Sequence, residues 1–164
     1  MLDFSNSKIL IVGDVMLDKY YFGKVDRISP EAPVPIVNIQ KEESRLGGAS
    51  NVANNIVSLG GHSLLCGVIG HDLFGKEIER ISRHKNIDTF LLKTSSPTIT
   101  KARIIGGKQQ IVRVDYEDKS ELNADNKKLF RDTISRILPE YDILVISDYG
   151  KGLISEDLCR YLIK

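Results

Sequence analysis

Two short apolar runs in this chain each stop at a carboxylate. They are residues 8–14 (KILIVGD) and 142–148 (DILVISD). Runs of this kind are typical of strands buried on both faces of a parallel sheet. Segments with helical periodicity alternate with them, at 49–59, 72–84 and 124–138. The alternation predicts an α/β fold, in which ligands bind beyond the carboxyl ends of the strands.

A second group of segments predicts a flap that stands apart from the main sheet. Prolines between residues 30 and 35 exclude a central strand from 27–40 and suit an edge strand or a flap. Residues 98–117 have the pattern of a hairpin that turns near Gly106 and Gly107. The other expected elements are a strand at 8–12 that leads into a loop, strands at 62–70 and 89–93, and a helix that begins at Ser155.

Composition and charge narrow the class of partner. A chain of 164 residues is long enough for one domain with a full core. Its 23 basic and 22 acidic residues are interspersed, which argues against nucleic acid or a membrane and favours a small molecule. The apolar run 9–12 is too short for a signal peptide or a membrane span, so we predict a cytoplasmic protein. Cys66 and Cys159 match no metal or redox motif and are expected to be buried thiols.

Carboxylates follow both apolar runs. Asp14 and Asp18 come directly after the first run, and Asp148 comes directly after the last. The end of a parallel strand is the expected ligand-binding edge of the sheet, so these side chains are candidate ligand contacts. The alternative is a solvated turn, in which the aspartates only cap the next segment.

Three cations fall on one face of the predicted hairpin. Residues i and i+2 of a strand share a face, so Lys101 and Arg103 point the same way, and Arg113 joins them from the partner strand. Such a group suits a phosphate, because Arg and Lys form charge-assisted hydrogen bonds to its oxygens. The alternative is a solvated strand face on which Asp115 and Glu117 neutralise the cations.

A glycine pair, Gly47 and Gly48, opens the helix expected at 49–59. Glycines let a ligand approach the backbone closely, and the free N–H groups of a helix start favour an oxygen-rich partner. Asn51, one turn into the helix, offers a donor and an acceptor to a hydroxyl. A plain turn is the alternative. Residues 12–18 (VGDVMLD) lack the G-x-G-x-x-G pattern, which argues against a nicotinamide enzyme.

Taken together, the motifs resemble one family. They are GDVMLDKY, RISPEAPVPIV, LGGASNVANNIVSLG, PTITKARII, QQIVRVDYE and SDYGKG, in this order and at these spacings. From about Lys8 onward they are similar to the N-terminal part of the heptose 7-phosphate kinases, which are ribokinase-like (PfkB) carbohydrate kinases. The resemblance implies a ribokinase-like parallel-sheet sandwich with a small β lid, formed by segments at about 20–40 and 98–117.

The same resemblance implies an activity. The family transfers the γ-phosphoryl group of ATP, with Mg²⁺, to the anomeric hydroxyl of D-glycero-D-manno-heptose 7-phosphate, a step toward ADP-heptose and the lipopolysaccharide core. Heptose hydroxyls are then expected to contact Asp14, Asp18, Gly47, Gly48 and Asn51, and the 7-phosphate is expected to contact Lys101, Arg103 and Arg113. Asp148 is expected to lie between the sugar and the nucleotide.

The family's catalytic base lies in a Gly-Ala-Gly-Asp motif that residues 1–164 do not contain. By this resemblance the chain is the sugar-binding half of a kinase, and its catalytic base lies beyond Lys164. We therefore expect residues 1–164 to be inactive alone, to bind neither ATP nor Mg²⁺ tightly, and to contain no metal site.

The resemblance also bears on partners. It implies a homodimer through the lid and a separate C-terminal kinase half beside the open edge of the strand at 142–147. The alternative function is a non-catalytic sugar-phosphate-binding or assembly module.

Overall fold

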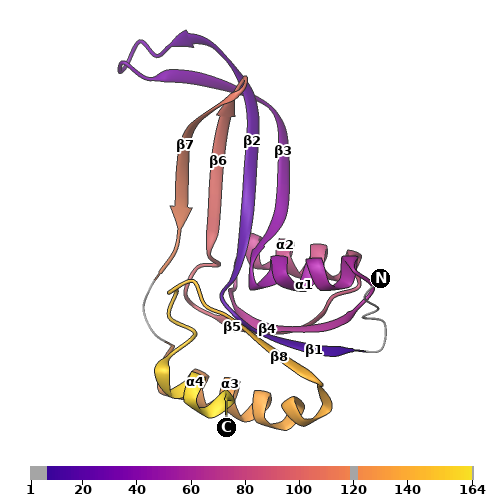
Figure 1. The fold of residues 1–164 in the computed structure, drawn as a ribbon. Helices are drawn as coiled ribbons and strands as arrows, with labels where there is room; N and C mark the ends of the chain where they lie inside the picture. The colour runs from indigo at the N-terminus through magenta and orange to yellow at the C-terminus, as the bar shows by residue number, and fades with distance from the viewer. Residues whose placement is uncertain (1–6, 119–121, 164) are drawn as a thin grey trace.

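A computed structural model describes residues 7–118 and 122–163, and in this part of the chain the strands form two separate four-stranded sheets (Figure 1). The first sheet is parallel throughout, in the order β5-β4-β1-β8. Its strands are β1 (Lys8–Gly13), β4 (His62–Gly70), β5 (Asp88–Thr94) and β8 (Ile143–Ser147). The α/β class predicted from the alternating pattern is therefore confirmed.

Helices cover both faces of the parallel sheet (Figure 1). They are α1 (Ala49–Ser58) and α2 (Leu73–His84) on one face, and α3 (Ala124–Ile137) and α4 (Glu156–Leu162) on the other, with a 3-10 turn at Leu138–Glu140. Successive side chains of a strand point to opposite faces. Ile9 and Ile11 of β1 accordingly lie in the core under α1 and α2, and Leu10 and Val12 lie in the core over α3 and α4.

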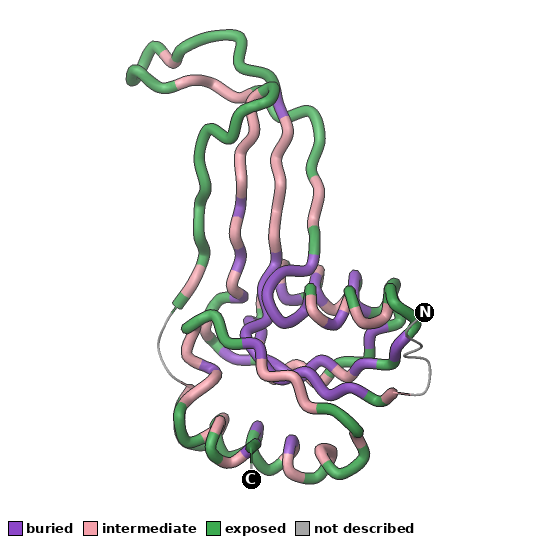
Figure 2. The backbone as a smooth tube through the Cα atoms, viewed as in Figure 1, coloured by how far each residue is buried: buried purple, intermediate pink, exposed green. Residues whose placement is uncertain are grey.

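The second sheet is the lid, in the order β3-β2-β6-β7. It contains β2 (Val15–Ile28), β3 (Pro35–Gly48), β6 (Thr100–Gly106) and β7 (Gln109–Tyr116). β2 and β6 are parallel, and the other two pairings are antiparallel. The lid extends away from the helices, and Figure 2 shows that it is buried mainly at its base.

The hairpin and the helix starts agree with the sequence predictions. Gly106 pairs with Gln109, so the chain turns at Gly107 and Lys108. Asp72 caps α2 by accepting a hydrogen bond from the backbone N–H of Gly75. Side-chain oxygens stabilise a helix start in this way because the first N–H groups have no partner within the helix.

The glycine pair precedes a helix, as predicted, since Gly48 is the N-cap of α1, and both glycines also end β3. Two expectations were wrong at the level of elements. The segment after β1 is not a loop, because β2 begins at Val15 and pairs with β3. β8 is not buried on both faces, since it is the edge of the sheet and only Ser147 in it is buried.

The two cysteines differ from each other. Cys66 on β4 is buried, and burial raises the pKa of its thiol to about 12. Cys159 on α4 is only half-buried, because that helix lies at the surface, so the expectation of burial was wrong for this residue. No helix in the described residues is long and apolar enough to cross a membrane.

Candidate functional site

The candidate site lies where the lid joins the parallel sheet. β1 ends there at Gly13, β8 ends at Ser147, and Asp14 connects β1 to β2. The backbone N–H of Asp14 donates to the carbonyl oxygen of Ser147 (3.0 Å), and its own carbonyl oxygen accepts from the N–H of Ala49 (3.0 Å). Asp14 thus ties together two parallel strands, the lid and the start of α1.

Asp14 is 2% exposed, and its carboxylate holds the loop that follows β8. Its Oδ2 accepts hydrogen bonds from the backbone N–H groups of Tyr149 (2.8 Å) and Lys151 (3.2 Å). Its Oδ1 has no hydrogen-bond partner among the described residues, and Asp14 lines a cavity of about 40 Å³. Burial raises the pKa of Asp14, these two N–H groups oppose the rise, and the charge of Asp148 adds to it.

The glycine pair makes room for the two aspartates. A Cβ on Gly47 would lie 2.6 Å from Oδ2 of Asp18. A Cβ on Gly48 would lie 2.4 Å from the carbonyl oxygen of Asp14, and Gly48 has a φ of +54°, which strains any L side chain. Both positions therefore require glycine for reasons internal to the chain, whatever ligand binds beside them.

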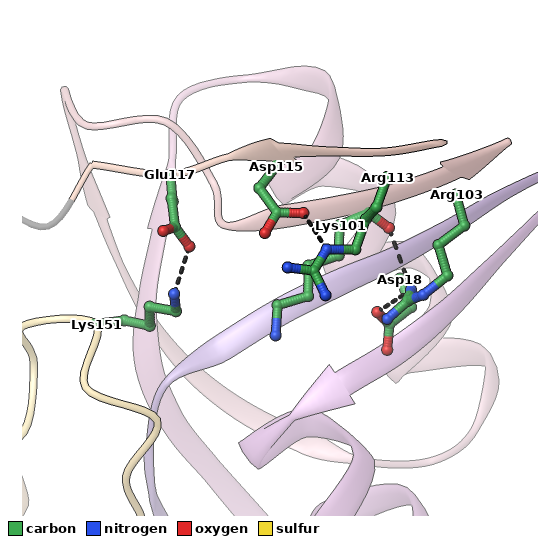
Figure 3. A network of polar contacts seen from close by, with 7 residues as sticks. All are labelled: Asp18, Lys101, Arg103, Arg113, Asp115, Glu117 and Lys151. Atoms are coloured by element: carbon green, nitrogen blue, oxygen red, sulfur yellow. Dashed lines mark hydrogen bonds and ion pairs between the residues drawn. The ribbon is translucent and has the colours of Figure 1, made fainter. Parts of the chain in front are cut away.

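An ion pair crosses the lid between two predicted site residues. Nη1 of Arg103 on β6 lies 2.6 Å from Oδ1 of Asp18 on β2, and each side chain is 21% exposed (Figure 3). Sequence analysis placed Asp18 with the sugar and Arg103 with the phosphate. The structure places the two groups in contact, because β2 and β6 are neighbouring parallel strands in which Tyr20 pairs with Arg103.

Two further ion pairs lie beside the first (Figure 3). Nε of Arg113 lies 2.9 Å from Oδ1 of Asp115, as the solvated-face alternative predicts. Glu117 instead pairs with Lys151, from the loop after β8, at 2.5 Å between Oε2 and Nζ. The Lys151–Glu117 pair is more buried than the Arg113–Asp115 pair and joins the lid to the parallel sheet.

Lys101 differs from the neighbouring cations. Its Nζ lies 5.9 Å from the centre of the Tyr149 ring, and no carboxylate among the described residues pairs with it. It shares a sheet face with Arg103 and Arg113, as the two-residue period predicted. An anionic ligand that binds Lys101 would therefore displace no carboxylate of the described residues.

A groove of about 600 Å³ brings Asp18 together with Asn51. Tyr20 and Arg45 also line this groove. Asn51 lies exposed in the first turn of α1, so it reaches the groove from the parallel-sheet side. The groove is open and lies at the base of the lid, where the two sheets meet.

Six of the nine predicted residues form two groups. Lys101, Arg103, Arg113 and Asp18 lie on the lid, and Asp14 and Asp148 lie at the carboxyl ends of the parallel strands. Asp148 is exposed, and its Oδ1 accepts a hydrogen bond from the N–H of Gly150 (2.7 Å).

Sequence reasoning missed four residues that connect or line these groups: Tyr20, Arg45, Glu117 as a partner of Lys151, and Lys151 itself. The two-residue spacing of Asp18, Tyr20 and Phe22 puts Tyr20 on the same face as Asp18, but this can be inferred only once β2 is identified as a strand.

Among the described residues, no group of three or more His, Cys, Asp or Glu side chains could hold a metal ion. The acidic residues of the site instead have basic or backbone partners, as the pairs above show.

The protein-family model of the pfkB family carbohydrate kinases matches residues 6–163. The chain belongs to this family. The match spans both sheets and all four α-helices described above. It confirms the ribokinase-like fold with its parallel sheet.

Among curated proteins, this chain is 46% identical over 151 residues to a D-beta-D-heptose 7-phosphate kinase from Bordetella bronchiseptica, covering 92% of this chain and 48% of that protein. It is 45% identical over 157 residues to the bifunctional protein HldE of Nitratiruptor sp., covering 96% of this chain and 34% of that protein. The chain therefore spans between a third and a half of the length of these relatives.

Solved structures support the fold. A phosphofructokinase-2 from Escherichia coli, in complex with fructose-6-phosphate, matches with a TM-score of 0.69 at 19% identity, covering 96% of this chain and 50% of that one. A putative phosphofructokinase from Staphylococcus aureus matches with a TM-score of 0.76 at 15% identity, covering 94% and 48%. At these identities the likeness concerns the fold alone.

Proposed function

We propose that residues 1–164 form the sugar-binding part of a cytoplasmic heptose 7-phosphate kinase. The complete kinase transfers the γ-phosphoryl group of ATP to the anomeric hydroxyl of D-glycero-D-manno-heptose 7-phosphate, on the route to ADP-heptose. The observation that carries the proposal is the pairing of a sugar-type ligand, Asp18, with a phosphate-type ligand, Arg103, on one face of the lid. The 46% identity to a heptose 7-phosphate kinase supports the choice of sugar.

In this proposal the carboxylates accept hydrogen bonds from heptose hydroxyls. An ionised acceptor binds a hydroxyl more strongly than a neutral one does. Asp18 lies in the groove for this role, with Asn51 beside it. Asp14 holds the loop after β8 through its Oδ2. Its buried Oδ1, which has no hydrogen-bond partner among the described residues, is available to accept a hydrogen bond. Gly47 and Gly48 line the approach, and Asp148 faces the nucleotide.

The 7-phosphate binds to the cations of the lid face, Lys101, Arg103 and Arg113. Lys101 has no carboxylate partner among the described residues, so a phosphate binds it without displacing an anion. Arg103 and Arg113 each have one carboxylate partner, and a guanidinium has five N–H donors. Donors therefore remain for the phosphate oxygens while the ion pairs persist.

Phosphoryl transfer needs groups in addition to these. ATP and Mg²⁺ supply the phosphoryl donor and its charge neutralisation in the complete kinase. We assign neither group to residues 1–164, which do not contain the Gly-Ala-Gly-Asp motif of the family. We propose that residues 1–164 alone do not turn over ATP, since they span less than half of the related heptose kinase. Incubation of the purified chain with ATP, Mg²⁺ and heptose 7-phosphate tests this, and bisphosphate formed at about 1 s⁻¹ or faster would contradict it.

The lid also provides a surface for a second copy of the chain. Its exposed apolar side chains include Ile111, Val112 and Val114 of β7, which is an edge strand. Exposed edge strands with apolar side chains favour association. We therefore retain the homodimer through the lid as part of the proposal.

The function is tested by ligand discrimination in the complete kinase. Arg103→Ala is expected to weaken the binding of heptose 7-phosphate about 10- to 150-fold, as the loss of a charge-assisted hydrogen bond implies. Binding of unphosphorylated heptose is expected to change less, because that ligand has no phosphate and is affected only through the lost partner of Asp18. Isothermal titration calorimetry measures both, with Lys108→Ala, in the exposed turn between β6 and β7, as the control. Equal losses of affinity for the two ligands would contradict the phosphate site and support the alternative, in which these cations lie on a solvated strand face.

A further inference from the structure

Tyr20 lies at the centre of the cationic lid face. It is two residues from Asp18 on β2, so both side chains are on the same face of the sheet. Cα pairing places Arg103 of β6 beside it on one flank and Glu43 of β3 on the other. Tyr20 also lines the groove that contains Asp18 and Arg45.

Two guanidinium groups lie over the Tyr20 ring, one from each neighbouring strand. The guanidinium carbon of Arg45 is 4.7 Å from the ring centre, and that of Arg103 is 5.1 Å away. The ring of Phe22 stacks beside Tyr20, with 6.1 Å between centres and 10° between planes. An aromatic face attracts cations at these distances through its quadrupole.

Each of these arginines also has one carboxylate partner. Arg103 pairs with Asp18, and Arg45 pairs with Glu43, both at 2.6 Å. A carboxylate holds a guanidinium by occupying its N–H donors, whereas a ring holds it by the face and leaves the donors free. The ring therefore fixes both side chains without competing for the hydrogen bonds that a phosphate needs.

We propose that Tyr20 is a positioning residue of the 7-phosphate site, which holds the guanidiniums of Arg103 and Arg45 with N–H donors available to the phosphate. The inference rests on the proposed function above and extends the phosphate site across β2 to Arg45 on β3. Tyr20 acts through the arginines. A long side chain that is already held in its binding geometry loses less conformational entropy when it binds a ligand.

The neighbouring residue provides a matched control. Tyr21 is on the same strand but on the opposite face, and its ring lies 5.3 Å from Nζ of Lys19. Both tyrosines are half-buried, and both contact a cation. Replacing Tyr21 by Leu therefore removes a ring and a cation contact from β2 without altering the predicted phosphate face.

The experiment compares Tyr20→Leu, Tyr20→Phe and Tyr21→Leu in the complete kinase, with heptose 7-phosphate and unphosphorylated heptose as the two substrates. KM and kcat are measured for each, together with thermal unfolding. Tyr20→Leu is expected to raise KM for heptose 7-phosphate about five- to thirtyfold, since two cation contacts are lost, and to raise KM for heptose by a clearly smaller factor, since only the groove lining changes for that ligand. Tyr20→Phe keeps the aromatic face and stays close to the unmodified protein, as does Tyr21→Leu.

The outcomes separate this inference from the proposed function. If the unmodified kinase does not prefer heptose 7-phosphate over heptose, the proposed function fails and this inference fails with it. If that preference exists and Tyr20→Leu retains it, only the inference is overturned. Equal effects of Tyr20→Phe and Tyr20→Leu also overturn it, because they assign the effect to the hydroxyl. Tyr20→Ile, which keeps a strand-favouring side chain, replaces Tyr20→Leu if that variant does not fold.

Discussion

Replacement of Asp72 by Ala tests how the base of the lid is held. The Asp72 carboxylate accepts hydrogen bonds from the N–H of Gly75 (2.8 Å), the N–H of Thr98 (2.7 Å) and the hydroxyl of Thr98 (2.7 Å). The Thr98 hydroxyl oxygen in turn accepts from the N–H of Gly70 (2.8 Å). One side chain thus caps α2 and fixes the segment that leads into β6, which carries Lys101 and Arg103.

The expected loss follows from these contacts. Removal of a helix cap costs about 1 kcal/mol. Thr98 is 1% exposed, so water does not reach its N–H, and leaving that donor unpaired costs about 1 to 3 kcal/mol more. Asp72→Ala is therefore expected to lower the free energy of unfolding by about 2 to 4 kcal/mol. Asp72→Asn should lie between, because its amide oxygen can still cap α2 while its NH₂ group cannot accept from Thr98.

Urea denaturation followed by circular dichroism measures these losses. Asn123→Ala is the matched control, since Asn123 caps α3 by accepting from the N–H of Asn126 (2.8 Å) and makes no long-range contact of the Asp72 kind with residues 7–118 or 122–163. This variant reports the cost of a cap alone, about 1 kcal/mol. If Asp72→Ala costs no more than Asn123→Ala, the bonds to Thr98 contribute nothing and the reasoning is refuted.

The same carboxylate predicts a pH dependence. Burial raises the pKa of Asp72, but the hydrogen bonds from Thr98 and Gly75 outweigh that effect and lower the pKa below its ordinary value of 3.8. A lowered pKa in the folded state means that the ionised form stabilises the fold above pH 3.8 and that this stabilisation is lost as the pH falls through the folded-state pKa. The difference in unfolding free energy between the unmodified protein and Asp72→Asn should stay constant from about pH 7 to pH 5 and shrink below pH 3.8.

Three further outcomes are expected. Asp14→Ala should lower the free energy of unfolding more than Asp14→Asn, because Asn retains an acceptor for the loop after β8 without burying a charge; urea denaturation at pH 7 that gave the reverse order would contradict this. Gly48→Ala should lower the melting temperature more than Gly60→Ala, since both residues have a positive φ but only Gly48 is crowded, by the carbonyl of Asp14 at 2.4 Å; equal shifts would refute the steric argument. Light scattering should find a dimer at tens of micromolar that Val114→Lys, on exposed β7, dissociates, and a monomeric unmodified chain would count against the lid interface.

Local patterns in the sequence account for much of the fold. β1, β4, α2 and the hairpin were predicted because apolar periodicity, glycine turns and the Asp72 cap act within a few residues. β2 was missed, since most of it lies in the lid and is only half-buried, so its pattern lacks a continuous apolar run. The burial predicted for the run at 142–148 was wrong, because burial depends on what packs over a strand, and β8 lies at an edge.

The candidate site was predictable in composition but not in connectivity. The two-residue period of a strand was enough to place Lys101 and Arg103 on one face. The pairing of the two hairpin strands placed Arg113 on the same face. The Asp18–Arg103 pair joins residues 85 positions apart, and it depends on the register of two parallel strands. No short stretch of sequence contains that register.

The sequence by itself determined which kinds of element form and which residue types occupy the ends of the strands, because backbone sterics and side-chain period act over a few residues. Only the tertiary structure decided which partner each charge takes: Asp14 holds the loop after β8, Lys151 pairs with Glu117, and the Tyr20 ring contacts two guanidiniums. These contacts need strands that are distant in the chain to align within a few ångströms. The folded core sets that alignment, since it fixes the register and the burial of every strand together.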